Sequence, residues 1–307
     1  MERITRALEL ARAQRERETR GGSTSAPGPA APPPVSPVAA APNVPPAAIS
    51  AAGPTLARSR GEPVAKVQAE PGAGDTATLR TRTIDASMAT LERERILAPG
   101  ASGPNGGPYK MLRTQVLLRL AQLGANTLAV LSPTEGAGKT LTAINLAIAI
   151  SAEEDRTVLL IDFDLRNPSI AARFGIRPEL GVEECIESGT PVRQAMIKIA
   201  GYERLTLLPA RTRLEASSEL LADQRTADIV AEMRARYANR ILIFDIPPVL
   251  QADDALSFTR HVQAGLLVVR EGDTRREDVT RSIELLRDLK IVGTVLNGSR
   301  DKSENSY

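Results

Sequence analysis

Short apolar runs alternate with stretches of helical periodicity through the second part of the chain. Each run holds four to six residues, mainly Leu, Ile and Val. The runs are Thr127–Ser132, Thr157–Asp162, Leu205–Leu208, Arg240–Asp245, Gly265–Arg270 and Ile291–Leu296. Such alternation is typical of a mostly parallel sheet with helices on both faces. The sequence therefore predicts one α/β domain over residues 85–300.

Two further helices are expected before the first run. One covers about Ser87–Ile96 and the other covers about Tyr109–Leu123, with a loop rich in glycine and proline between them. The apolar residues of the second helix at helical spacing are Met111, Leu112, Val116 and Leu120. The domain is expected to begin with these helices.

The first 84 residues differ in composition from the rest. Residues 1–20 predict a short, charged amphipathic helix. Its apolar face consists of Ile4, Ala7, Leu8 and Ala11. Residues 21–84 are rich in Pro and Ala and are predicted to be a disordered linker, because such a segment buries too little apolar surface to fold. The helix is interpreted either as a dispensable end or, preferably, as a docking module on a tether.

Composition narrows the possible functions. Aromatic residues make up 3% of the chain and tryptophan is absent, so platforms for stacking nucleic-acid bases are not expected. Lys and Arg total 39 against 37 Asp and Glu, a balance that does not favour a nucleic-acid partner. The single Cys and single His exclude an internal disulfide and a Cys/His zinc cluster. No apolar run reaches the length of a membrane span, so no transmembrane segment is expected.

A glycine-rich loop follows the first apolar run. Ser132–Thr140 reads Ser-Pro-Thr-Glu-Gly-Ala-Gly-Lys-Thr and leads into a predicted helix over Leu141–Ser151. Glycines let the loop turn its N–H groups towards a phosphate, and the N-terminus of the helix adds a partial positive charge. Lys139 is expected to reach the β- and γ-phosphates, and the Thr140 hydroxyl is expected to bind Mg²⁺. The predicted nucleotide-contacting residues of the loop are Glu135, Gly136, Ala137, Gly138, Lys139, Thr140 and Leu141.

Carboxylates lie at the ends of two other apolar runs. Asp162 and Asp164 follow the second run, and Asp245 ends the fourth run just before two prolines. Ligands of parallel sheets gather at the carboxyl ends of the strands, so these side chains are expected near the glycine-rich loop. Phosphoryl transfer needs a lysine, a metal held by carboxylates and a group that orients the nucleophile. Each Asp could instead cap a turn, but this alternative is weaker for all three together.

The last apolar run ends in Val295-Leu296-Asn297-Gly298. The Asn-Lys-x-Asp pattern of guanine readers does not occur in the chain, so ATP is favoured over GTP. Asn297 could pair with adenine, or it could simply form the turn before Gly298. The residues alone leave both alternatives open.

Together these motifs resemble those of the bacterial tyrosine kinases of polysaccharide export, in particular the exosortase-associated subgroup. The similarity covers about residues 87–298 and includes the glycine-rich loop, the segment Asp162–Pro168, the segment Ile243–Pro248 and Val295–Asn297. It implies a P-loop NTPase fold with ATP and Mg²⁺ as cofactors. It also implies a non-specific protein-tyrosine kinase that regulates exopolysaccharide synthesis or export.

The resemblance also implies roles for single residues. Lys139, Asp162 and Asp164 would be catalytic, with Asp162 activating the attacking hydroxyl. The residues implied to hold Mg²⁺ are Thr140, Asp164 and, through water, Asp245. Asn297 would join the nucleotide-binding set. Such kinases modify tyrosines in their C-terminal tails, which points to Tyr307 in the polar tail over residues 301–307.

The other tyrosines, Tyr109, Tyr202 and Tyr237, are predicted to be packing residues because they lie in or beside predicted helices. The resemblance further implies a membrane-anchored chain-length or activator protein as partner. The chain would then act in the cytoplasm at the inner membrane, with a homo-oligomer as a further expectation. The family's oligomerising Glu-x-x-Arg-x-x-Arg falls on Gly107, Lys110 and Arg113, so only its last position is matched.

Two alternative functions are kept. A switch ATPase of the Min or Par type would hydrolyse ATP without labelling itself. Those proteins carry a further lysine early in the loop, where this chain has Thr134. An adaptor that binds nucleotide but has lost kinase activity is the other alternative, since the tail offers a single tyrosine.

Overall fold

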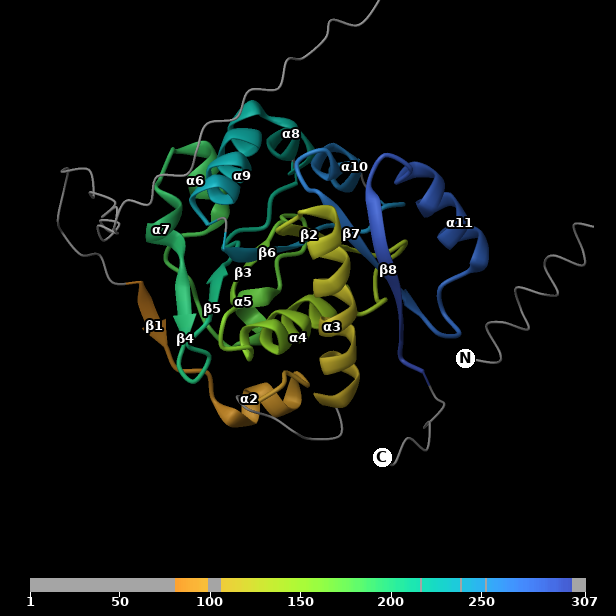
Figure 1. Ribbon diagram of the computed structural model, residues 1–307. Helices are drawn as coiled ribbons and strands as arrows, with labels where there is room; N and C mark the ends of the chain where they lie inside the picture. The colour runs from red at the N-terminus through yellow and green to blue at the C-terminus, as the bar shows by residue number, and fades with distance from the viewer. Residues whose placement is uncertain (1–80, 99–105, 216, 238, 252, 300–307) are drawn as a thin grey trace, which may run out of the picture. The chain divides into compact units, whose positions relative to one another are not determined.

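The computed structural model describes residues 81–98, 106–215, 217–237, 239–251 and 253–299 (Figure 1). The predicted N-terminal helix, residues 21–80 of the predicted linker and the polar tail with Tyr307 lie outside the described residues. The last residues of the predicted linker, Arg82–Ile84, instead form a strand that pairs with Ile197–Ile199, so the prediction of disorder is wrong there. Backbone contacts divide the chain into two units, Met1–Pro71 and Gly72–Tyr307. Every described residue belongs to the second unit.

The described residues contain an eight-stranded sheet in the order β1-β4-β5-β3-β6-β2-β7-β8. The strands are β1 Arg82–Ile84, β2 Thr127–Leu131, β3 Thr157–Asp162, β4 Ile197–Ile199, β5 Leu205–Leu208, β6 Arg240–Asp245, β7 Ala264–Arg270 and β8 Lys290–Asn297. All neighbours are parallel except β4 and β5, which are antiparallel. The predicted mostly parallel sheet is therefore confirmed. The sequence analysis missed β1 and β4, two strands of three residues each.

Helices lie on both faces of the sheet (Figure 1). They are α2 Met88–Arg93, α3 Gly106–Leu123, α4 Lys139–Ser151, α5 Ile170–Arg173, α6 Val182–Glu187, α7 Val192–Ala195, α8 Ser217–Ala222, α9 Gln224–Arg236, α10 Asp254–Thr259 and α11 Arg276–Leu285. Residues of α2 to α5 pack on one face, and residues of α6 to α11 pack on the other.

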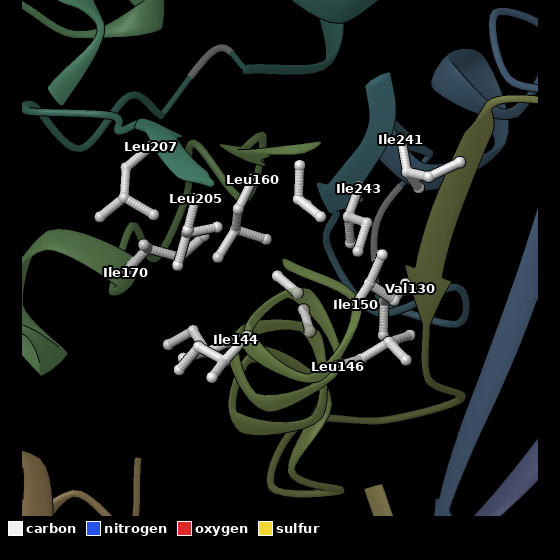
Figure 2. Packing of buried hydrophobic residues seen from close by; sticks show 14 of the residues in the cluster. Val130, Ile144, Leu146, Ile150, Leu160, Ile170, Leu205, Leu207, Ile241 and Ile243 are labelled. Atoms are coloured by element: carbon white, nitrogen blue, oxygen red, sulfur yellow. The ribbon is translucent and has the colours of Figure 1, made fainter. Parts of the chain in front are cut away.

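The central strands are buried on both sides. On β2, Leu128 and Val130 join the core beneath α4, whereas Ala129 and Leu131 join the core on the opposite face. This explains why the strands read as continuous apolar runs rather than as alternating ones. Figure 2 shows the first of these cores, where α4 packs against side chains of β2, β3, β5 and β6. The packing fixes the N-terminus of α4 at the carboxyl ends of the strands.

The helix α3 corrects one expectation. Val116 and Leu120 are buried as its spacing predicted, but Met111 is 64% exposed. The helix lies across α4 and exposes the side that carries Met111 and Leu118. Arg113 on the same helix forms an ion pair with Glu153, with Nε 3.0 Å from Oε1. That pair joins α3 to the end of α4.

Candidate nucleotide-binding site

The glycine-rich loop connects β2 to α4, and its backbone depends on two glycines. Gly136 has φ 76° and Gly138 has φ 87°, values that side chains rarely adopt. A Cβ added to Gly138 would also overlap the side-chain amide of Asn297. The helix α4 begins directly after Gly138, at Lys139, two residues earlier than the predicted Leu141 start. Its N-terminus therefore faces the space above the loop, where an anion is favoured.

The structure brings Lys139 together with two of the predicted carboxylates. Its Nζ lies 2.7 Å from Asp245 Oδ1 and 3.1 Å from Asp164 Oδ2. All three side chains are buried or nearly so, at 7%, 0% and 9% exposed for Lys139, Asp245 and Asp164. A buried cation between two buried carboxylates satisfies the need to pair charges away from water.

Asp162 lies next to this group but is held differently. Residues Asp162 and Asp245 are register partners on the adjacent strands β3 and β6. Asp162 Oδ2 accepts hydrogen bonds from the backbone N–H groups of Ser169 and Ile170, each at 2.9 Å. The carboxylate is therefore fixed by the start of α5, and it does not pair with Lys139.

Burial and mutual repulsion shift the titration of this cluster. Burial and, after it, the charge of Asp245 raise the pKa of Asp162 to about 8, against the lowering effect of the two backbone hydrogen bonds and Lys139. Burial also raises the pKa of Asp245, although Lys139 opposes that rise. Burial alone would lower the pKa of Lys139, but Asp245 and Asp164 together bring it above its ordinary value. The lysine is therefore protonated at neutral pH.

The oxygen groups at this edge suit a hard cation. Asp162 Oδ1 and Asp245 Oδ2 are buried without a hydrogen-bond partner among the described residues. The Thr140 hydroxyl is near enough to Asp245 to lower the pKa of that carboxyl, and it lies 3.5 Å from Ser169 Oγ. Within the described ranges, no group of three or more His, Cys, Asp or Glu side chains is arranged to hold a metal alone. The donors fit Mg²⁺, which is usually held by one or two carboxylates with waters and phosphate oxygens.

A cavity of about 650 Å³ opens above the loop. Its lining includes the loop residues Glu135 to Leu141, together with Asp164 and Asn297. It also includes five residues that the sequence analysis did not single out: Arg95, Asn167, Ser169, Arg173 and Arg270. These come from three separate stretches of the chain, so no single spacing could have indicated them. A second cavity, of about 680 Å³ between α6 and α9, contains none of the predicted residues.

The structure shows Asn297 in the turn before Gly298, whereas its pairing with adenine stays a prediction. Its Oδ1 accepts a hydrogen bond from the N–H of Gly298 at 2.9 Å, as in a turn before glycine. Its Nδ2 donates to the carbonyl of Ala137 at 2.9 Å, so the amide also holds the loop. In this structure both ends of the amide are used within the protein.

The remaining tyrosines are packing residues as predicted. Tyr202 is 5% exposed and its hydroxyl donates to the carbonyl of Leu97 at 2.7 Å. Tyr109 and Tyr237 are partly buried against the two cores. Tyr307 lies outside the described residues, so its assignment as phospho-acceptor stays a prediction.

Residues 124–306 match the family model ParA, described as a NUBPL iron-transfer P-loop NTPase. The chain belongs to this family of P-loop NTPases. The fold class predicted from the sequence is thereby confirmed. The single cysteine of this NTPase, Cys185, is buried, and burial raises its pKa to about 12, so it is not a thiolate available to ligate iron.

Similar proteins of known type are tyrosine kinases. The NTPase is 26% identical over 219 residues to tyrosine-protein kinase YwqD of Bacillus subtilis, covering 71% of this chain and 91% of YwqD. It is 28% identical over 200 residues to tyrosine-protein kinase Etk of Escherichia coli, covering 64% of this chain but only 27% of Etk. The NTPase thus spans about a quarter of that longer relative.

Solved structures agree with this resemblance. The kinase domain of Escherichia coli Etk superimposes with a TM-score of 0.58 at 27% identity, covering 65% of this chain and 77% of that domain. The resemblance to bacterial tyrosine kinases predicted from the motifs is confirmed. The finer assignment to the exosortase-associated subgroup stays a prediction.

Proposed function

We propose that this chain is an ATP-dependent protein-tyrosine autokinase that regulates exopolysaccharide synthesis or export. The observation that carries the proposal is the meeting of Lys139 with Asp164 and Asp245 at the first turn of α4. Catalysis of phosphoryl transfer is mainly positioning and charge stabilisation, and this cluster offers both. Similarity to a kinase along nearly the whole length of YwqD supports the same assignment.

In the proposed reaction, Lys139 exchanges its two carboxylates for phosphate oxygens of ATP. The backbone N–H groups of the loop and the N-terminus of α4 hold the same phosphates. Thr140, Asp164 and Asp245 are the residues that would hold Mg²⁺, which when bound neutralises charge on the β- and γ-phosphates. When Lys139 turns to the phosphates, Asp164 and Asp245 lose the cation that pairs with them. A divalent cation would replace it.

Asp162 is the proposed proton acceptor. The tyrosine oxygen forms a bond to the γ-phosphorus while its proton passes to Asp162, and the bond from that phosphorus to the β–γ bridging oxygen breaks to leave ADP. Burial raises the pKa of Asp162 to about 8, so the carboxyl of the nucleotide-free protein is mostly protonated at pH 7 and must ionise before it can accept the tyrosine proton. Tyr307 is the proposed acceptor in the tail.

The proposal extends to a partner. Among the described residues, none of the helices has the length and apolar character needed to cross a bilayer. We infer that the kinase acts in the cytoplasm at the inner membrane through a membrane-anchored chain-length or activator protein, and that it forms a homo-oligomer. The predicted helix over residues 1–20 and its linker are candidates for docking to that partner.

Labelling with γ-phosphate-labelled Mg·ATP tests the proposal. The wild-type chain, with and without a candidate activator, is expected to incorporate label that maps to Tyr307. Lys139→Met should remove the label, because the residue that contacts the phosphates is lost, and Tyr307→Phe should reduce it severalfold. Lys290→Met, at an exposed lysine at the other end of β8 from Asn297, is the matched control and should label normally.

Each other result selects a different function. Label that survives Lys139→Met would refute the assignment of the site. Release of phosphate without labelled protein would favour the switch ATPase, and ATP binding with neither product would favour the adaptor.

A further inference from the structure

Two side chains hold the glycine-rich loop from the side of β7 and β8. Arg270 Nη1 donates to the carbonyl of Gly136 at 2.8 Å, and Asn297 Nδ2 donates to the carbonyl of Ala137 at 2.9 Å. Arg270 and Asn297 are the last residues of β7 and β8 and are register partners in that parallel pair. Adjacent strands thus present two donors side by side to two consecutive carbonyls of the loop.

The two donors are themselves fixed by local hydrogen bonds. The N–H of Arg270 donates to Thr274 Oγ1 at 2.8 Å, and the N–H of Thr274 returns a bond to the Arg270 carbonyl at 3.0 Å. The N–H of Glu271 donates to the carbonyl of Asn297 at 2.9 Å, which joins the ends of β7 and β8. The side chains of Arg270 and Asn297 therefore project from strand ends that are fixed by hydrogen bonds.

This arrangement bears directly on phosphate binding. A loop with two glycines at positive φ has many other conformations open to it, and ordering it on binding would cost affinity. The carbonyls of Gly136 and Ala137 already accept hydrogen bonds from Arg270 and Asn297. The N–H groups of the loop therefore stay free to face the anion. Gly138 fits because a side chain there would displace the Asn297 amide.

We propose that Arg270 is a positioning residue which, together with Asn297, keeps the loop in its phosphate-binding shape before nucleotide arrives. The guanidinium acts through the Gly136 carbonyl and not as a ligand of the nucleotide. The inference rests on the nucleotide binding proposed above. It assigns a role to a residue that lines the cavity and that no motif had indicated.

The test compares Arg270→Gln with Arg276→Gln in the full chain. Arg276 is an exposed arginine at the start of α11, and within the described residues its side chain has no hydrogen bond or ion pair. Its substitution therefore removes one positive charge, as Arg270→Gln does, without removing the contact to the loop. Calorimetry gives the dissociation constant for Mg·ATP, and hydrogen exchange of the nucleotide-free protein reports on the loop amides of residues 134–138.

We expect Arg270→Gln to weaken Mg·ATP binding about three- to tenfold, the range for one lost hydrogen bond. The loop amides should also exchange severalfold faster in the absence of nucleotide. Arg276→Gln should stay within twofold of wild type in both measurements. Circular dichroism and thermal unfolding confirm that the variants are folded.

Two results would overturn the inference. Weaker binding with unchanged exchange would mean that Arg270 contacts the nucleotide directly, and unchanged values in both would mean that the contact has no effect. If the wild-type chain takes up no ATP, the proposed function fails, while the exchange comparison still decides whether Arg270 orders the loop.

Discussion

Asp162 has no solvent-exposed surface and ends β3 beside Asp245. Burial and the neighbouring carboxylate raise the pKa of Asp162 from 3.8 to about 8. In the nucleotide-free protein it therefore binds a proton over a pH range in which the unfolded chain does not. The folded state loses that advantage as the pH rises from about 4 through 8, so this carboxyl makes stability fall in that window.

Asp162→Asn should reduce this pH dependence. The amide keeps the acceptor for the N–H groups of Ser169 and Ile170 but cannot ionise. We expect the free energy of unfolding of the nucleotide-free wild type to fall by a few kcal/mol, on the order of one to three, between pH 5 and pH 8. The variant should fall by clearly less, as measured by urea denaturation at each pH.

A control and a contrary result are available for this prediction. Asp288→Asn removes a carboxylate that is 95% exposed, and its stability curve should run parallel to that of the wild type. Asp245 also has a raised pKa, so some slope should persist in Asp162→Asn. Equal slopes in Asp162→Asn and the wild type would show that Asp162 is ionised throughout the window.

The helix α4 also holds the segment that follows α2. Its buried Asn145 reaches the segment after α2, where Nδ2 donates to the Arg95 carbonyl at 3.0 Å and Oδ1 accepts from the Leu97 N–H at 2.9 Å. Arg95 has φ 58°, a value that non-glycine residues rarely adopt. The Asn145 amide thus holds a strained turn that places Arg95 on the lining of the nucleotide cavity.

Asn145→Ala should therefore destabilise the fold strongly for a single polar residue. Two hydrogen bonds are lost, and the buried N–H of Leu97 and the partly buried carbonyl of Arg95 are left without these partners, so we expect a loss of about 2–4 kcal/mol in urea denaturation. Asn239→Ala, at an exposed position before β6, should change stability by less than about 0.5 kcal/mol. A similarly small effect of Asn145→Ala would mean that water replaces the amide.

Elements differ in how well the sequence alone predicts them. Five of the six predicted strands, β2, β3, β5, β6 and β7, are largely buried and were predictable because burial on two sides demands an uninterrupted apolar run. The sixth, β8, is an edge strand that is mostly exposed or half-buried, and its apolar run still revealed it. The strands β1 and β4 were not, since three residues carry no periodicity and depend on pairing with each other and with β5. Met111 was placed on the apolar face of α3, but a helix with apolar residues on more than one side does not reveal which side is buried.

Some residues of the candidate site could likewise be predicted from the sequence, and others could not. Lys139 and the three aspartates could be predicted because each follows an apolar strand, and parallel strands bring their carboxyl ends to one edge. Arg95 and Arg173 could not, because each reaches the cavity from an element whose position depends on packing elsewhere. Arg270 ends the predicted run Gly265–Arg270 at the same edge, so its position could have indicated it, but only the carboxylates there were considered. The ion pairs of Lys139 with Asp164 and Asp245 also required coordinates, since sequence order does not give side-chain distances.

Across the whole domain, the site ties together elements that are distant in sequence. The loop follows β2, the carboxylates end β3 and β6, and the clamp of Arg270 and Asn297 ends β7 and β8. A ligand that contacts all of them binds the folded state and not the unfolded chain. Binding should therefore stabilise the domain as a unit, by RT ln(1 + [L]/Kd).

We expect saturating Mg·ATP to raise the melting temperature by about 5–10 °C, since 100-fold excess over Kd contributes about 2.7 kcal/mol and a domain of this size gains roughly 2–4 °C per kcal/mol. Lys139→Met should lose this shift, and it should also melt earlier without nucleotide, because Asp164 and Asp245 are left buried without their cation. Lys290→Met should keep the wild-type shift. A full shift in Lys139→Met would place the phosphates away from this lysine, and the function built on its two carboxylates would fall with it.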